Sequence, residues 1–153
     1  MSDRPIRVLF VCTGNSARSQ MAEAILRRQG GHDFEVFSAG VSPRPVHPLA
    51  IRVLAEIGLD ISGARSKSTA PFVAQQFDYV VTLCDRARQD CPFFPGAHEI
   101  MHWGLDDPAE APGSEEEQLV VFRRVMTEVA GRVRTFLMVA RRAQAATPAA
   151  PRG

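Results

Sequence analysis

The sequence predicts an α/β fold with a four-stranded parallel sheet and helices on both faces. Apolar runs of strand length, several of them rich in branched side chains, occupy 6–11, 34–38 and 77–83, and a shorter run occupies 98–102. Stretches with apolar residues at helical spacing lie between and after these runs. Strands that alternate with helices in this way favour a layered architecture built on a parallel sheet.

Three helices are predicted by the spacing of apolar residues and by the residues that flank them. The stretch 19–29 has an apolar stripe and stops at two glycines, and 47–57 has a second stripe that a glycine ends. A long amphipathic pattern covers 114–143. It starts with Ser114 three residues before Glu117, which fits a capping box.

The length and composition are typical of one ordinary globular domain. We expect the 153 residues to form a single domain over 1–142 and a disordered tail over 143–153, because that last stretch is rich in Ala and Pro. A net charge of +1, without a long run of like charge, argues against a face that binds nucleic acid. No stretch approaches the roughly 18 consecutive apolar residues of a membrane span.

The first residues and the cysteine count bear on the cellular compartment. The chain opens with a polar stretch rather than a secretion signal, and it has an odd number of cysteines, three. A structural disulfide framework is therefore not expected, and the thiols should be reduced, reactive or buried in the cytoplasm. We expect a monomer without a metal ion.

The first cysteine stands where a strand gives way to a helix. Cys12 follows the run 6–11, and Arg18 and Ser19 open the helical stretch, so the loop reads Cys-x5-Arg-Ser. In such a loop, backbone N–H groups and the helix dipole point at one spot, which makes a cup for a tetrahedral oxyanion. Arg18 can close over the anion with its planar donor fork, and the same field favours a thiolate at Cys12. The residues predicted to bind the oxyanion are Thr13, Gly14, Asn15, Ser16, Ala17 and Arg18.

This loop indicates a nucleophile beneath a bound oxyanion, as a phosphatase or an arsenate-converting enzyme requires. The alternative is an inert core cysteine at a strand end, because free cysteine is often buried. The loop residues are small or polar where a core would be apolar, which favours the oxyanion cup.

The other two cysteines form a pair further along the chain. Cys84 directly follows the run 77–83, so it should lie at the same sheet edge as Cys12. Cys91 is seven residues beyond Cys84, about 10.5 Å along a helix axis, whereas a disulfide needs Cα atoms within about 6.8 Å. A bond between them would require the helix to unwind, which suits a redox switch, and Pro92 weakens that end.

Two other interpretations of the cysteine pair stay open. The two cysteines could be unrelated to each other. A zinc site that includes His98 and His102 is disfavoured, because structural zinc sites use ligand pairs two to four residues apart.

A carboxyl group is presented by Asp107, which Pro108 holds in an extended backbone conformation. A rigid carboxylic acid can protonate a leaving oxygen, so beside an oxyanion cup Asp107 is a candidate general acid. Asp-Pro is also common in turns, and a simple turn is the alternative.

Taken together, these motifs resemble the low-molecular-weight protein tyrosine phosphatase superfamily, and within it the thioredoxin-coupled arsenate reductases. The resemblance covers the chain to about residue 141 and implies a low-molecular-weight phosphatase-like fold. The pair of Cys84 and Cys91 separates the reductases from the phosphatases. The residues that carry the resemblance are Val11 to Ser16, Arg18 to Glu23, Ser38 to Gly40, Val80 to Cys84, Cys91 and Pro92, His102 to Gly104, and Asp106 to Ala109.

The resemblance implies a role for each residue around the oxyanion. Cys12 would attack arsenate held by the loop amides and Arg18, while Asp107 protonates the departing oxygen. Ser19 and Asn15 would hold the loop and stabilise the thiolate by hydrogen bonding. Phosphate and sulfate would compete with arsenate as oxyanions.

The resemblance also implies a relay of thiols. Cys84 would attack the Cys12 sulfur of the arsenic adduct, and arsenite would leave. Cys91 would then attack Cys84, and thioredoxin would reduce the resulting Cys84–Cys91 disulfide. The implied function is arsenate reduction in arsenic detoxification without a cofactor. Glutathione or glutaredoxin is the alternative electron donor.

The sequence departs from the family pattern at three points. Ala17 stands where many members have a second loop cysteine. Lys67 falls near where some reductases use an acidic residue to bind potassium, beside Asn15 and Ser38, and its ammonium group would supply the charge instead. Asp107-Pro108 is followed by Ala109 and Glu110 rather than by the aromatic pair with which phosphatases line a phosphotyrosine slot.

Two alternative functions follow from the same residues. One is a low-molecular-weight protein tyrosine phosphatase in which Cys84 and Cys91 are incidental. The other is a non-enzymatic arsenic sensor that binds through the three thiols, although the sequence has no recognisable DNA-reading helix pair.

Overall fold

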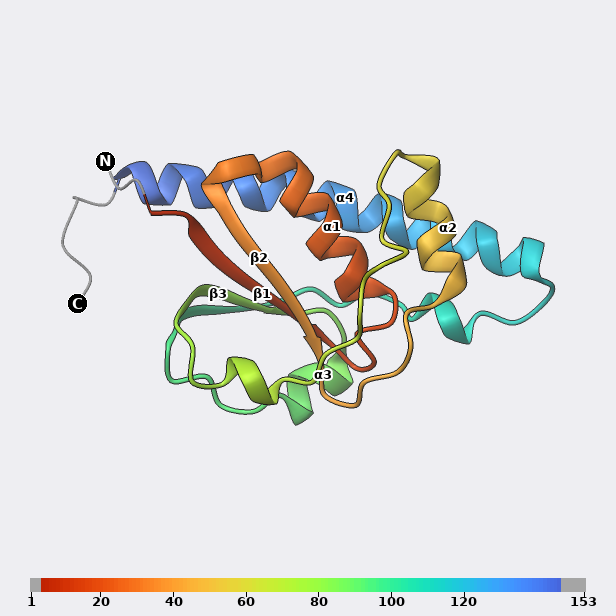
Figure 1. The fold of residues 1–153 in the computed structure, drawn as a ribbon, viewed down its shortest axis with the longest axis horizontal. Helices are drawn as coiled ribbons and strands as arrows, with labels where there is room; N and C mark the ends of the chain where they lie inside the picture. The colour runs from red at the N-terminus through yellow and green to blue at the C-terminus, as the bar shows by residue number, and fades with distance from the viewer. Residues whose placement is uncertain (1–3, 147–153) are drawn as a thin grey trace.

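Four parallel strands form the centre of the computed structural model, which describes residues 4–146 (Figure 1). They are β1 (Ile6–Cys12), β2 (Phe34–Gly40), β3 (Phe77–Thr82) and β4 (Ala97–His102), in the order β2-β1-β3-β4. All three pairings are parallel. The predicted four-stranded parallel sheet is therefore confirmed.

Helices cover both faces of this sheet, as predicted (Figure 1). On one side lie α1 (Arg18–Gly30) and α4 (Glu115–Ala146), with α2 (Pro48–Glu56) packed against α4. On the other side lie α3 (Asp85–Asp90) and a short 3-10 turn, η2 (Ala70–Phe72). None of the helices within residues 4–146 combines the length and apolar character that a membrane span requires.

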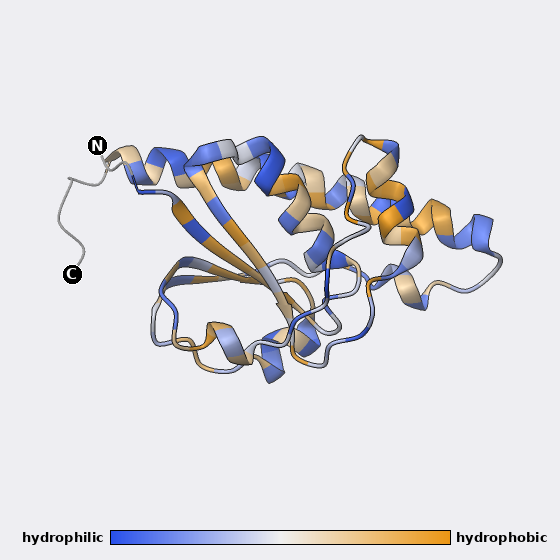
Figure 2. Ribbon diagram, in the orientation of Figure 1, coloured by the Kyte–Doolittle hydropathy of each residue, from blue (hydrophilic) through white to orange (hydrophobic). Residues whose placement is uncertain are grey.

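The core includes nearly all of β1, which lies between two other strands. Six of its seven residues are buried, and only Arg7 is partly exposed. Figure 2 shows hydrophobic residues along the central strands and hydrophilic residues on the outer parts of the long helix. Phe10 of β1 packs on Trp103 with ring centroids 5.6 Å apart. Because β1 is held on both faces, the residue at its carboxyl end, Cys12, has a fixed position.

The long helix begins as predicted and ends later than predicted. The Ser114 N–H donates to Glu117 at 3.1 Å, and the Glu117 N–H donates back to the Ser114 hydroxyl at 3.2 Å, which confirms the capping box. Residues 143–146 belong to α4 and not to a disordered tail. Gln144 donates to the Arg4 carbonyl at 2.9 Å, and this contact with the start of the chain extends the helix. The rest of the expected tail, 147–153, lies outside the described residues.

Candidate active site

The loop between β1 and α1 carries the first cysteine at its base. Cys12 is 1% exposed, and the helix begins at Arg18. Asn15 is the one non-glycine residue within 4–146 that has a positive φ, 49°. Its side-chain oxygen accepts from the Lys67 N–H at 2.9 Å and its carbonyl accepts from the Ser66 hydroxyl at 2.8 Å, so this strained turn is held by the segment after α2.

A second segment, residues 41–47, runs beside the loop and braces it. Its backbone N–H groups donate to loop carbonyls at 2.8 to 3.1 Å: Val41 to Cys12, Ser42 to Thr13, Arg44 to Gly14 and His47 to Ser16. In a trans peptide the N–H points opposite to the C=O. Carbonyls that bond outward to this bracing segment therefore turn the following loop N–H groups toward the inside of the cup.

The end of β2 must approach the loop closely for this brace to form. Gly40 pairs with Cys12 in the sheet. A Cβ atom at Gly40 would lie 2.7 Å from the Asn15 nitrogen and 2.8 Å from the Thr13 oxygen, both backbone atoms. Only glycine fits at this position, which explains the Gly that ends the second strand.

The Cys12 sulfur has two hydrogen-bond partners of its own. The Asn15 N–H donates to it at 3.2 Å, and the Ser19 hydroxyl lies 2.9 Å away. Ser19 also accepts from the Asn15 side-chain amide at 2.7 Å. The Ser19 hydroxyl hydrogen is therefore available to the sulfur. Ser19 and Asn15 therefore both lie within hydrogen-bonding distance of the Cys12 sulfur.

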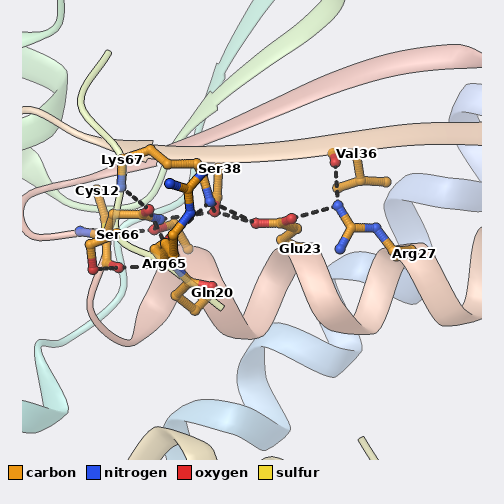
Figure 3. A network of polar contacts seen from close by, with 11 residues as sticks. Cys12, Gln20, Glu23, Arg27, Val36, Ser38, Arg65, Ser66 and Lys67 are labelled. Carbon is orange, nitrogen blue, oxygen red and sulfur yellow. Dashed lines mark hydrogen bonds and ion pairs between the residues drawn. The ribbon is translucent and has the colours of Figure 1, made fainter. Parts of the chain in front are cut away.

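Polar contacts continue from this sulfur along α1 to Arg27 (Figure 3). The Asn15 amide donates to the Ser38 hydroxyl at 2.9 Å, and Ser38 in turn donates to the Glu23 carboxylate in a short hydrogen bond. Arg27 donates to the other oxygen of Glu23 at 2.5 Å. Glu23 is 9% exposed, so its charge is balanced inside the protein.

Lys67 lies among the same groups, as expected from the sequence. Its ammonium nitrogen is 3.1 Å from the Arg65 carbonyl, 3.5 Å from the Ser38 hydroxyl and 3.7 Å from the Glu23 carboxylate. These oxygens are the ligands that a potassium ion would need, and a cationic side chain already lies among them. The residues present therefore do not fit a potassium ion.

Arg18 is buried at the side of the cup with one nitrogen unused. The side chain is 6% exposed. One terminal nitrogen donates to the Leu105 carbonyl at 3.2 Å, and the other lies 3.4 Å from an Asp107 carboxylate oxygen. Within residues 4–146 the buried Arg18 Nε has no hydrogen-bond partner. An orphaned buried donor of this kind costs about 1–3 kcal/mol, which an oxyanion at Nε would offset.

Asp107 lies at the pocket and also caps a turn. Its backbone is extended, and one carboxylate oxygen accepts from the Ala109 N–H at 3.0 Å to cap a short 3-10 turn, η3 (Pro108–Glu110). The other oxygen faces Arg18. The turn therefore holds the carboxyl group at the pocket, so the turn and the acid that the sequence suggested are compatible.

These groups line one pocket of about 210 Å³. Pockets for drug-sized ligands occupy roughly 300–1,000 Å³, so this one suits a small anion. Two charged residues at its walls, Arg44 and Arg86, were not expected from the sequence, whereas Glu110 lies beside Asp107 as the sequence suggested. The residues around the pocket are Cys12, Thr13, Gly14, Ser16, Ala17, Arg18, Arg44, Cys84, Arg86, Asp107, Ala109 and Glu110.

Cys84 shares this pocket with Cys12, whereas Cys91 does not line it. The Cys84 sulfur lies 3.2 Å from the Thr13 hydroxyl and accepts from the Ala87 N–H at 3.4 Å as the N-cap of α3. Cys91 stands at the other end of α3, half-buried, and burial raises the pKa of its thiol. All three cysteines are free thiols. The helix that the spacing argument supposed is therefore present.

His102, considered above as a zinc ligand, has other partners. It contacts the Thr82 hydroxyl at 2.8 Å and the Asp85 carboxylate at 3.1 Å, and it ties β4 to the first residue of α3. Residues 4–146 contain no group of three or more His, Cys, Asp or Glu side chains that could hold a metal ion.

The comparison with protein families agrees with this geometry. Residues 7–146 match the family described as low molecular weight phosphotyrosine protein phosphatase. The chain belongs to this family. An arsenate reductase of Halalkalibacterium halodurans is 46% identical over 84% of this chain and 93% of its own length. One of Bacillus subtilis is 41% identical over the same shares of the two chains.

Solved structures of this family share the fold. An arsenate reductase in the oxidized state has a TM-score of 0.75 and 35% identity, over 86% of this chain and 96% of its own. A thioredoxin-dependent arsenate reductase of Corynebacterium glutamicum has a TM-score of 0.69 and 32% identity, over 92% of this chain and 65% of its own. The resemblance stated from the sequence is therefore confirmed, including its arsenate reductase branch.

Proposed function

We propose that this family member reduces arsenate to arsenite by a relay from Cys12 to Cys84 to Cys91, with thioredoxin as reductant, in arsenic detoxification. The observation that carries the proposal is a second thiol, Cys84, in the same small oxyanion pocket as Cys12. A phosphatase needs one nucleophile, whereas removal of two electrons from two thiols needs a second sulfur within reach. The similar proteins named arsenate reductase support the same chemistry.

The first step forms an adduct. Arsenate binds the loop amides and Arg18, and the Cys12 thiolate attacks arsenic to form a sulfur–arsenic bond. An arsenate oxygen departs as water, with Asp107 supplying a proton. Arsenic stays pentavalent in this step. The unpaired Nε of buried Arg18 supports this anion position, and the nearness of the Asp107 carboxyl group to Arg18 supports its role as the acid.

The second step transfers the electrons. The Cys84 thiolate attacks the Cys12 sulfur and forms a Cys12–Cys84 disulfide. The electron pair of the sulfur–arsenic bond passes to arsenic, which leaves as trivalent arsenite. The Cys84 sulfur lies beside the Thr13 hydroxyl and the Ala87 N–H, and both groups can stabilise its charge.

The third step moves the disulfide outward. The Cys91 thiolate attacks Cys84, a Cys84–Cys91 disulfide forms and Cys12 is released as a thiolate. α3 separates the two residues, so it must unwind before they can bond. Burial raises the pKa of the Cys91 thiol, and unwinding would expose it and return the thiol to ordinary acidity. Thioredoxin then reduces this disulfide by a dithiol exchange.

Phosphatase activity is the second candidate, because the oxyanion cup would also hold phosphate. Ala109 and Glu110 line the pocket where an aromatic wall for phosphotyrosine would stand. We therefore expect cleavage of small aryl phosphates only as a side reaction. Phosphate and sulfate should inhibit arsenate reduction by competition.

The test is NADPH-coupled arsenate reduction with thioredoxin and thioredoxin reductase, with Cys91→Ser and Cys12→Ser run in parallel. Turnover by the native chain and none by either variant supports the full relay. Equal turnover by Cys91→Ser excludes Cys91 from the relay and favours a small-thiol donor. Cleavage of p-nitrophenyl phosphate without arsenate turnover would support the phosphatase, and neither activity would support an arsenic-binding protein.

A further inference from the structure

Arg44 is presented to the pocket by a rigid stretch of backbone. It stands between Pro43 and Pro45, and the two rings limit the backbone on both sides. Its N–H donates to the Gly14 carbonyl at 2.9 Å. Its Cβ and Cγ atoms lie 3.6 Å from the place that a Cβ on Gly14 would take. The stem of the side chain is therefore laid against the oxyanion loop, and the residue lines the pocket.

Within the described residues the Arg44 guanidinium has no ion-pair partner, unlike those of the other two arginines in the pocket. Arg18 is buried and paired with Asp107. Arg86 pairs with Asp90 along α3 at 3.5 Å. Over residues 4–146, by contrast, the exposed Arg44 guanidinium makes no hydrogen bond or ion pair. An exposed guanidinium on a fixed backbone, beside an anion pocket, has its donors free for an incoming anion.

We propose that Arg44 is a capture residue, which draws the oxyanion into the pocket and contacts it before Arg18 does. The inference rests on the proposed function in naming arsenate as that oxyanion. A charge of this kind raises the association rate of an anion and loses its effect as salt screens it. Arg44 makes no hydrogen bond to the Cys12 sulfur or to Cys84, so it should act on entry of the substrate and not on the sulfur chemistry.

The test is a charge series at this position: Arg44→Lys, Arg44→Gln and Arg44→Glu. At about 10 mM ionic strength, where the Debye length is about 30 Å, we expect kcat/KM for arsenate to fall about tenfold in Arg44→Gln. The fall should be larger in Arg44→Glu and smaller in Arg44→Lys, with kcat within about twofold of the native value. Near 1 M salt, where the Debye length is about 3 Å, the variants should converge.

The matched control is Arg134→Gln, which removes the same charge from an exposed position on α4 outside the pocket. It should keep the native kcat/KM at low salt. The proposal is overturned if Arg44→Gln and Arg44→Glu keep native kcat/KM at low salt. It is also overturned if Arg134→Gln matches their loss, or if the loss is independent of salt.

A second measurement separates this proposal from the function on which it rests. Inorganic phosphate should protect Cys12 from the uncharged reagent iodoacetamide, measured on the Cys12 peptide by mass spectrometry. We expect Arg44→Gln to need about tenfold more phosphate for the same protection at low salt. If arsenate is not reduced but this shift is seen, the reductase function fails and anion capture by Arg44 stands. Unshifted phosphate protection overturns the capture role, whatever the enzyme reduces.

Discussion

The three thiols differ in burial and in hydrogen-bond partners, and these differences order their reactivity. Cys12 is inaccessible from outside except through the pocket, and it has two polar partners at its sulfur. Cys84 has the Thr13 hydroxyl and an N–H of α3. Burial of Cys91 raises the pKa of its thiol and so disfavours its thiolate while α3 is folded. In the resting protein, the first two sulfurs therefore have polar partners in the pocket, whereas the third thiol is disfavoured as a nucleophile until α3 opens.

Ser19→Ala tests the support of the nucleophile. It removes the hydroxyl 2.9 Å from the Cys12 sulfur. A hydrogen bond to a charged group contributes about 1.5–3 kcal/mol, so alkylation of Cys12 by iodoacetamide at neutral pH should slow about tenfold or more. Ser62→Ala, at an exposed site away from the loop, should leave the rate unchanged. An unaltered rate in Ser19→Ala would show that Ser19 does not stabilise the thiolate.

His47 makes one end of the bracing segment sensitive to pH. Its Nδ1 accepts from the Leu49 N–H at 3.1 Å and caps α2, and its ring lies 4.7 Å from that of buried Phe122. Burial lowers the pKa of His47 below the usual 6.5, while the Asp107 carboxylate acts in the opposite sense. A cap that accepts at Nδ1 requires the neutral ring, because the protonated ring has a hydrogen there.

The sign of the pH effect follows from linkage. Because the pKa of His47 is lower in the folded state, the unfolded chain binds more protons. The contribution of His47 to the free energy of unfolding is therefore complete above pH 6.5 and declines as the pH falls toward the folded-state pKa. Urea titrations between about pH 7 and pH 5 should show a steeper decline for the native chain than for His47→Asn, which keeps a capping group that does not titrate. Parallel declines in the two proteins would contradict this role of His47.

At the scale of elements, α3 is a short helix whose unfolding is part of the proposed chemistry. It has six residues, of which only Ala87 is buried. Its ends are the two relay cysteines, so its stability opposes formation of their disulfide. The proposed relay needs a helix that is stable enough to position Cys84 and weak enough to open.

Arg88→Gly should shift this balance. Glycine is less favourable than alanine inside a helix by about 0.8–1 kcal/mol, and arginine ranks close to alanine. The Cys84–Cys91 disulfide should therefore become about fourfold harder to reduce in equilibrium with dithiothreitol. Arg134→Gly makes the same change in α4, which the relay does not unwind, and should leave this equilibrium unchanged. Equal disulfide stability in Arg88→Gly and the native chain would mean that α3 does not need to open.

The end of β2 is the second element with a direct effect on the site. Gly40→Ala would place a methyl group within 2.8 Å of backbone atoms of the oxyanion loop. Overpacking of this kind costs about 1–3 kcal/mol, and we expect a matching loss of unfolding free energy together with weaker phosphate protection of Cys12. Gly63→Ala, which meets no heavy atom within 4 Å, is the control and should change neither quantity.

At the scale of the whole molecule, the site depends on a core that lies behind it. Phe122 of α4 is fully buried and lies beneath His47, whose N–H holds the Ser16 carbonyl at 3.0 Å. α4 thus supports the oxyanion loop through α2 and the bracing segment, although it contributes no residue to the pocket. Stability and anion binding should therefore decline together when this contact is removed.

Phe122→Ala should lower the unfolding free energy by about 3–5 kcal/mol in urea titrations, as large-to-small core substitutions do. It should also weaken phosphate protection of Cys12 while the protein remains folded. Val120→Ala, at a residue 62% exposed on the same helix, should cost less than about 0.5 kcal/mol. Unchanged phosphate protection in folded Phe122→Ala would mean that the brace does not depend on α4.

The sequence alone was enough to predict the parallel sheet, the capping box at Ser114 and the loop that carries Cys12 between a strand and a helix. Each of these depends on residues close together in the chain: an apolar run of strand length, a period of 3.6, a pair three residues apart, a cysteine six residues before an arginine. Such patterns involve only neighbouring residues, so they can be recognised without knowledge of any distant contact. The resemblance to arsenate reductases rested on the same short motifs.

Only the tertiary structure decided which residues brace the oxyanion loop, which charges are paired around it and which residue stands at the mouth of the pocket. The bonds from residues 41–47 to the loop, the Lys67 ammonium beside Glu23 and the Asp107 carboxylate beside Arg18 join residues far apart in the chain. The length of α4 was likewise decided by a contact, from Gln144 to Arg4. Such contacts follow from strand register and helix packing, which side-chain periodicity does not specify. From the sequence, Arg44 is an ordinary turn residue. The register of β1 with β2 is what places it at the mouth of the pocket.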